Sequence, residues 1–243
     1  MGSNGWATHA GSVNVIPAVC PASGLSDHDG GEAERTAGGK RLTYADYLHL
    51  DGLLDAVRPL FADGDPAAWG DERFFLIIHQ VSELWVSQIL ADLEVALEAA
   101  RRGDFDKAID RLKRANAVLE LTLTTQGALE HLAVDDFHRF RPHLQGVSAA
   151  QSPQLATLLT GADHAPVAGL LEITADRRAG DSASRRQKLH LNAQLDVFIA
   201  GLTRWRLGHV DAVRRFIGDG PGTGGSAGVS YLIDCLDGTP RPS

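Results

Sequence analysis

The sequence predicts an all-α fold, a helical bundle built around three long helices. Three stretches repeat apolar residues at steps of three and four, the spacing that places side chains on one face of an α-helix. They cover residues 71–100, about 104–123 and about 186–217. No convincing strand pair and no repeat of fixed period is present. The composition, with 44% hydrophobic and 22% charged residues, is typical of a globular chain with a core.

The first 40 residues are rich in Gly, Ser, Ala and Asp and follow neither a helical nor a strand period. We therefore expect residues 1–40 to form a flexible extension. One folded domain should cover residues 41–236, and residues 237–243 should form a flexible tail. The domain should open with a short amphipathic helix that Thr43 caps and that Pro59 interrupts.

The first two long helices should form an antiparallel hairpin. The apolar stripe of the first consists of Phe74, Ile78, Val81, Trp85 and Ile89. Acidic Asp71 and Glu72 stand in its first turn, where the helix dipole favours negative charge. The second helix begins near Asp104, and the short connection at 102–103 suits antiparallel neighbours.

Shorter elements should lie between this hairpin and the third long helix. Asp135 and Asp136 open a short helix that Pro142 limits, and residues 145–153 are typical of a loop. Residues 156–184 show weak periodicity, so we expect a loop with one short helix. The third long helix, about 186–217, ends at a glycine-rich run over 218–226, and a brief apolar stretch follows at 229–236.

Charge and hydropathy exclude several classes of partner. The net charge of −8 argues against binding to nucleic acid or to an anionic membrane surface. The longest apolar runs, such as residues 74–78, are far shorter than the roughly 20 residues that span a bilayer, so no membrane helix is expected. Cys20 and Cys235 provide neither a disulfide framework nor a CxxC motif, and a reducing cytoplasm is the expected location.

Two histidines, His79 and His209, lie within the apolar stripes of different long helices. A buried imidazole needs a hydrogen-bond partner or a metal, because an unsatisfied buried polar group costs roughly 1 to 3 kcal/mol. A bond to a neighbouring carbonyl would satisfy either one. A single imidazole facing an apolar slot also suits haem iron, which needs only one protein ligand. Paired His and Glu ligands are missing, which fits haem better than a zinc or di-iron site.

A second group of residues could bind an amino acid. Arg141 shares a helix face with Phe137, and a guanidinium beside aromatic rings can bind a carboxylate through two hydrogen bonds. A solvated surface arginine is the alternative. Residues 222–226 offer backbone amides and a hydroxyl that could close over a ligand, but no Gly-Lys-Ser/Thr follows, so the run is not a P-loop.

Taken together and in order, five strings resemble the tryptophan 2,3-dioxygenase family. They are LTYADYLHLD at 42–51, FLIIHQVSELW at 75–85, FR at 140–141, WRLGH at 205–209 and GTGGSAGVSYL at 222–232. The combination of HQVSELW with GTGGS is specific to that family. The resemblance implies a helical homotetramer, or at least a homodimer, with one haem b per subunit buried between long helices.

The resemblance also implies a role for individual residues. His209 matches the axial ligand of the haem iron, His79 matches the distal histidine that binds the indole N–H, and Ser148 matches a serine beside it. The residues that match substrate contacts are Phe75, which lines the indole pocket, Arg141, which binds the carboxylate, Thr223, which binds carboxylate and ammonium, and Phe137 beside the arginine. Tyr44, Tyr47 and Leu48 match an N-terminal helix that enters the pocket of a neighbouring subunit.

The implied reaction uses O2 as co-substrate and opens the indole C2=C3 bond to an N-formylkynurenine-type product. Three departures from the family pattern bear on this expectation. Phe137 stands where a tyrosine is usual, Gln126 where a tryptophan is common, and Ala149-Ala150 where a Gly-Phe pair is common. These changes should enlarge or loosen the pocket.

Three functions therefore stay open. The first is dioxygenation of L-tryptophan or of a modified, for example methylated, tryptophan. The second is monooxygenation to an oxindole or hydroxylated indole in natural-product biosynthesis. The third is a haem-binding sensor without turnover, although a sensor has no use for the amino-acid-binding residues His79, Arg141 and Thr223.

Overall fold

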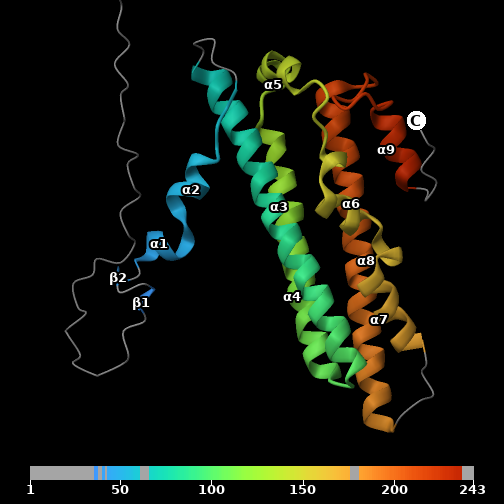
Figure 1. Cartoon of the computed structure of the whole chain (residues 1–243). Coiled ribbons are helices and arrows are strands. Elements are labelled where there is room, and N and C mark those ends of the chain that lie inside the picture. Colours follow the sequence, from blue (N-terminus) through green and yellow to red (C-terminus); the bar gives the residue numbers. More distant parts are fainter. Residues whose placement is uncertain (1–35, 38–39, 42, 61–65, 176–180, 237–243) are drawn as a thin grey trace, which may run out of the picture. The chain divides into compact units, whose positions relative to one another are not determined.

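The computed structural model describes residues 36–37, 40–41, 43–60, 66–175 and 181–236, and these are almost entirely helical (Figure 1). The all-α prediction is confirmed. Contacts divide the chain into two units, residues 1–50 and 51–243, which we describe separately. The expected tails and the domain limits 41–236 stay predictions.

Among its described residues, the first unit contains two strands of two residues each and one short helix. Strands β1 (Thr36–Ala37) and β2 (Lys40–Arg41) pair antiparallel. Helix α1 (Tyr44–Leu48) begins at a capping box, in which the Thr43 hydroxyl accepts from the Asp46 N–H and the Asp46 carboxylate accepts from the Thr43 N–H.

The predicted helix between Thr43 and Pro59 is broken by His49. This residue adopts a left-handed conformation with φ of 51°, which ends α1. The next helix, α2, covers Leu50–Asp55. The pattern correctly predicted helix here, but it gave no sign of the break.

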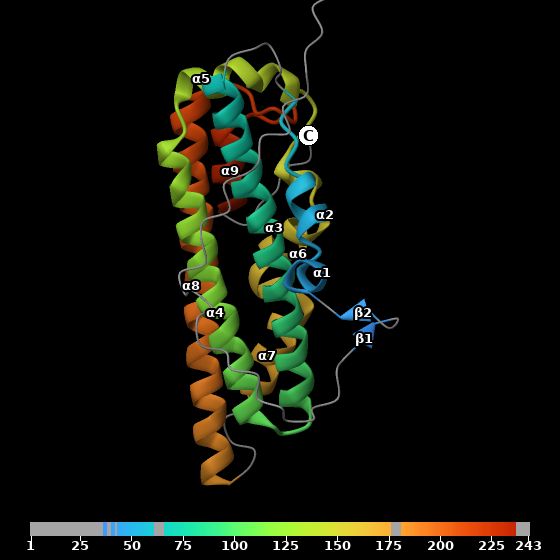
Figure 2. The same ribbon diagram turned by 90° about the vertical axis from the view of Figure 1, so that its left-hand side faces the viewer.

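Three long helices form the core of the second unit, as predicted. They are α3 (Pro66–Arg101), α4 (Phe105–Gly127) and α8 (Ser182–Ile217). Asp104 caps α4 by accepting from the Lys107 N–H, and α3 and α4 form the expected antiparallel hairpin. Helix α4 packs along both α3 and α8 (Figure 1, Figure 2). The largest fully buried side chains of this core include Ile89, Leu93, Leu112, Leu119, Leu195, Phe198 and Leu202.

The expectation of a loop with one short helix at 156–184 is wrong. Most of α6 (Pro153–Leu159) and all of α7 (Ala165–Ala175) lie there. Helix α6 begins at Ser152, whose hydroxyl accepts from the Leu155 N–H. Helix α7 packs against α3 and α8. It is apolar over most of its circumference, which removes the polar–apolar alternation that periodicity needs.

The start of α3 and the end of α8 lie at the same end of the bundle, where α5 (Val134–Phe140) lies between them and contacts both (Figure 1). Short 3-10 turns connect the chain around it: η1 (Ala128–His131), η2 (Arg141–Leu144), η3 (Ala149–Gln151) and η4 (Gly161–Asp163). After the glycine-rich run, α9 (Val229–Leu236) packs on α8. A second apolar cluster fills this end, with Ile78, Leu132, Phe137, Phe140 and Phe216 buried in it.

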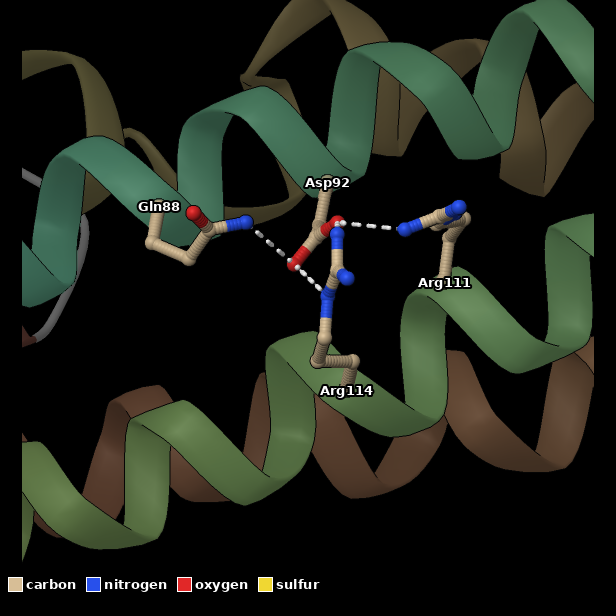
Figure 3. A network of polar contacts seen from close by, with 4 residues as sticks. All are labelled: Gln88, Asp92, Arg111 and Arg114. Atoms are coloured by element: carbon tan, nitrogen blue, oxygen red, sulfur yellow. Dashed lines mark hydrogen bonds and ion pairs between the residues drawn. The ribbon is translucent and has the colours of Figure 1, made fainter. Parts of the chain in front are cut away.

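A buried carboxylate joins α3 to α4 in the middle of the bundle (Figure 3). Asp92 is 1% exposed, and its oxygens accept from Arg114, at 2.8 Å from Nε, and from Gln88 at 3.0 Å. Arg111 lies 3.9 Å away. Burial alone would raise the pKa of Asp92, but these hydrogen bonds and positive charges hold it below its usual value.

By length and composition α3 could cross a membrane, but one such helix is weak evidence for that. In the structure α3 packs against α4, α5, α6 and α7. It also carries two buried carboxylates, Glu72 and Asp92, which accept hydrogen bonds from Leu60 N and from Arg114. These contacts are those of a core helix in a bundle.

Candidate active site

His79 lies in the first half of α3, with its ring against Phe75. Its Nδ1 atom donates to the Phe75 carbonyl oxygen at 2.7 Å, and the two ring centroids are 4.1 Å apart. This bond is the carbonyl partner expected for a core histidine. Because Nδ1 carries the proton, Nε2 is the acceptor nitrogen of a neutral ring. Burial lowers the pKa of His79, more than the Phe75 carbonyl and the Glu83 charge raise it.

His209 lies in the second half of α8, stacked on the indole of Trp205. The ring centroids are 5.4 Å apart and the planes differ by 5°. Burial, and to a smaller extent the charge of a protonated His79, lowers the pKa of His209 to about 4. The two imidazoles are therefore close enough to interact electrostatically, and both are neutral near pH 7.

The donor set here fits haem better than a multi-ligand metal centre. Among the described residues, no three His, Cys, Asp or Glu side chains gather in a way that could hold a metal ion. His209 supplies one neutral imidazole, which is the form that binds iron, and haem needs one such protein ligand. His79, across from it on α3, is part-buried and not a member of any such group.

Aromatic rings continue from His79 toward α5 and the end of α8. Phe75 lies 5.9 Å from Phe137 and 5.5 Å from Phe140, and Phe137 lies 4.7 Å from Phe216, all between ring centroids. Phe137 is buried among these rings. The structure thus brings Phe75, Phe137 and His79 together beside one apolar surface.

Arg141 follows directly after α5 and faces the glycine-rich run. One of its terminal nitrogens donates to the Pro221 carbonyl oxygen at 2.6 Å. Its Nε atom is buried and has no hydrogen-bond partner among the residues that the structure describes. This arginine is part-buried rather than solvated, and one donor stays available for an acceptor such as a carboxylate.

Thr223 ties the glycine-rich run to the segment after η2. Its carbonyl oxygen accepts from the Gly146 N–H at 2.9 Å, and its hydroxyl donates to the Val147 carbonyl oxygen at 2.7 Å. A Cβ atom added to Gly224 would lie 2.7 Å from the Cβ atom of Ser148, so only glycine allows this close approach. Ser148 therefore packs on the glycine-rich run, which contains Thr223 and to which Arg141 donates a hydrogen bond.

The remaining predicted site residues, Tyr44, Tyr47 and Leu48, lie on α1 in the first unit with exposed side chains. Their assignment to a neighbouring subunit's pocket stays a prediction.

Sequence reasoning missed Glu83, and it did not foresee the contact that Gln126 makes. Glu83, one helical turn after His79, accepts from the Ser152 hydroxyl at 2.9 Å and from the Gln154 amide at 3.1 Å, which ties the loop after Ser148 to α3. Its place four residues after His79 in the HQVSELW string was the available signal. Gln126 is buried and packs against the backbone of α8 near Gly208, a contact that no local pattern could indicate.

Comparison with known proteins agrees with this arrangement. The family model of tryptophan 2,3-dioxygenase matches residues 26–160, more than half of the 243 residues. The chain is 30% identical to the tryptophan 2,3-dioxygenase of Anaeromyxobacter sp. (strain K), over 80% of this chain and 91% of the relative. It is 31% identical to that of Anaeromyxobacter dehalogenans over the same shares, and 28% identical to that of Pseudomonas aeruginosa over 90% and 94%.

The range matched by the family model includes the candidate site residues Phe75, His79, Phe137, Arg141 and Ser148. The matches to whole relatives extend over most of the chain. With an all-α bundle and paired neutral imidazoles on two long helices, sequence and structure agree: the chain belongs to the tryptophan 2,3-dioxygenase family.

Proposed function

We propose that the protein is a haem-dependent oxygenase that acts on the indole C2=C3 bond of L-tryptophan or a modified tryptophan, by dioxygenation to an N-formylkynurenine-type product. The observation that carries this proposal is the buried Nε of Arg141, which has no hydrogen-bond partner in the part of the chain that the structure describes. It lies beside the aromatic cluster at the end of the bundle that holds both imidazoles. An amino acid with an aromatic side chain matches that combination of donor and apolar surface.

His209 would hold haem b through its imidazole, and the pKa of about 4 keeps that ring unprotonated at physiological pH. Bound haem supplies the activation of O2, while the protein supplies binding and orientation. Part-buried apolar side chains on α3, including Phe74, Phe75 and Trp85, offer surface for a flat ligand.

His79 would orient the indole. Its Nδ1 proton is committed to the Phe75 carbonyl, so Nε2 presents a lone pair that can accept the indole N–H. Phe75, whose ring lies against that imidazole, would line the indole pocket. Ser148 would act beside His79, close to the glycine-rich run on which it packs.

Arg141 and Thr223 would hold the amino-acid end of the substrate. The Arg141 Nε can donate to a carboxylate oxygen, and the guanidinium charge strengthens that bond. The Thr223 hydroxyl donates its hydrogen bond to the Val147 carbonyl oxygen, so its lone pairs can accept from the substrate ammonium. A sensor without turnover does not explain such a donor and acceptor pair.

Monooxygenation to an oxindole-type product is the second candidate, and Phe137 favours it. This ring lies where the family usually has a tyrosine, one turn from Arg141, and it is buried among Phe75, Phe140 and Phe216. The part of the site around Arg141 therefore has one hydroxyl fewer than is usual in the family. This weakens its hydrogen bonding to the substrate and changes how an oxygenated substrate is held.

The oligomer would complete the site. Tyr44 and Tyr47 expose 76% and 68% of their surface on α1, although aromatic residues of that size are usually covered. A homotetramer, or at least a homodimer, in which this helix enters the neighbouring pocket would cover them. We place the protein in the cytoplasm, with a small-molecule substrate and no nucleic-acid or membrane partner.

One incubation distinguishes these functions. Reduced, haem-loaded protein is mixed with L-tryptophan and with its methylated analogues under labelled O2, and the products are weighed by mass spectrometry. Two labelled atoms in the product support dioxygenation. One labelled atom, with turnover that depends on ascorbate, supports monooxygenation instead. Absence of product together with a visible spectrum that ignores every analogue would leave only the sensor.

A further inference from the structure

Gln126, near the end of α4, reaches across to the turn of α8 that carries His209. Its side chain is buried. With the amide oriented to match its neighbours, its nitrogen donates to the Trp205 carbonyl oxygen at 3.2 Å and its oxygen accepts from the His209 backbone N–H at 3.0 Å. Both polar atoms of the carboxamide are thus used on one turn of another helix.

These two backbone groups are ordinarily each other's partners. In an α-helix the N–H of one residue bonds the carbonyl four residues earlier, and Trp205 and His209 are four residues apart. The Gln126 carboxamide pairs with both ends of this single hydrogen bond. A side chain of α4 therefore bonds to both ends of the α8 turn that leads to His209 and its imidazole.

Gly208 makes this approach possible. A Cβ atom added at 208 would lie 3.1 Å from the Gln126 amide group, closer than almost all Cβ contacts. The ring of Trp205 lies parallel to that of His209, so the two ends of the turn are also in contact through their side chains. Backbone and ring of His209 are thus both held in place.

We propose that Gln126 is a positioning residue for His209, holding the backbone turn that presents the imidazole to the haem iron. The proposal rests on the proposed function only in assigning His209 to iron. The hold on the backbone itself is a property of the polypeptide, and it can be measured without haem.

The first measurement uses the full chain without haem and follows exchange of the His209 backbone amide hydrogen by NMR. In Gln126→Leu the amide loses its side-chain acceptor, and its exchange should become roughly 5- to 10-fold faster, the effect of one hydrogen bond. In Gln126→Glu an acceptor remains, so exchange should lie closer to that of the unaltered chain. Core amides of α8, such as that of Phe198, report any general loss of stability.

Gln187→Leu is the matched control. Gln187 also bridges α8 and α4, through a 2.9 Å bond to Asp106, and it lies roughly 33 Å along α8 from His209 at 1.5 Å per residue. It should leave the His209 amide unchanged. Equal protection of that amide in the unaltered chain and in Gln126→Leu would overturn the proposal. If Gln126→Leu does not fold, Gln126→Met, which keeps the side-chain length without an amide, takes its place, and the same faster exchange at His209 relative to the unaltered chain is expected.

The second measurement uses the haem-loaded protein and follows transfer of haem to an excess of a haem-binding acceptor protein. Gln126→Leu should release haem several-fold faster than Gln187→Leu, and equal rates would overturn the role toward iron. If the unaltered chain takes up no haem, the proposed function fails, while the amide measurement still decides whether Gln126 holds the turn.

Discussion

Two charged side chains of this bundle, the buried Asp92 and the part-buried Arg141, differ in how far their hydrogen-bonding groups are satisfied. Asp92, between α3 and α4, accepts from Arg114 and Gln88 and has Arg111 nearby (Figure 3). Arg141, at the end of the bundle, has one carbonyl partner, and its buried Nε has no partner among the described residues. The first arrangement is complete without a ligand, whereas the second leaves a strong donor available, and this difference separates a structural ion pair from a binding group.

The two regions should therefore respond differently to substitution. Substitutions at the end that holds His209 and Arg141 should abolish or weaken the binding of haem or substrate. They should leave the free energy of unfolding nearly unchanged. Substitutions around Asp92 should lower the free energy of unfolding and leave ligand binding nearly unchanged. A substitution that did both would break the distinction.

The largest effect is expected for His209→Ala. Without the axial imidazole, haem should no longer bind at one per chain, because no second ligand replaces it. Since the imidazole is part-buried and neutral, the free energy of unfolding of the haem-free chain should change by less than about 1 kcal/mol. Absorbance titration with haem and thermal unfolding of the haem-free chain measure the two quantities. Haem retained at full occupancy would remove His209 from the site.

Arg141→Ala should spare haem and weaken the binding of tryptophan by roughly 2 to 5 kcal/mol, the loss typical of a buried charge pair. A spectroscopic titration of the haem-loaded protein measures it. Arg139→Ala is the control, because this neighbouring arginine is exposed and bonds Asp136 on the same helix. Equal affinities in the two variants would show that the Arg141 Nε binds no carboxylate.

Arg114→Met should destabilise the fold by roughly 2 to 3 kcal/mol. It leaves the buried Asp92 with fewer donors, and the estimate is below the full value for a buried pair because the Arg114 side chain is half exposed. Arg102→Met, which breaks an exposed pair with Glu98, should cost at most about 0.5 kcal/mol. Denaturant unfolding compares the two variants, and haem binding should be the same in both.

The smallest expected effect is on the stability of the fold at acidic pH. The pKa of Asp92 in the fold lies below its usual value of 3.8, so its contribution to stability is present above pH 3.8 and is lost as the pH falls through the folded-state pKa. Asp92→Asn should therefore show a shallower loss of stability below that pH than the unaltered chain. Denaturant unfolding at several acidic pH values tests this, and identical slopes would contradict the shift.

The sequence predicted the fold where local pattern and tertiary packing agree. The stripes on α3, α4 and α8 face the core, so their spacing was enough. Only one short helix, without bounds, was predicted in the region of α7, because Pro166, Val167, Leu170 and Thr174 are buried around an almost wholly apolar helix. Ser152 and Pro153 did offer a helix start for α6, a signal that outweighs weak periodicity.

The candidate site likewise contains residues that the sequence could predict and contacts that it could not. Arg141 and His209 could be proposed because residue type and helical spacing carry the argument locally. The contacts of Gln126 and Glu83 could not be predicted, since each residue bonds to groups on distant segments, the backbone of α8 for Gln126 and the Ser152 loop for Glu83. Such contacts exist only once the helices have packed.

The tie between the glycine-rich run and the rest of the site also has a kinetic consequence. Among the described residues, hydrogen bonds join this run to its surroundings from Gly146 to Thr223, from Thr223 to Val147 and from Arg141 to Pro221. If the substrate of the proposed function enters beneath this run, these bonds must open first. Opening of the run would then limit turnover together with bond cleavage, and a slow catalytic cycle would not by itself mean slow chemistry.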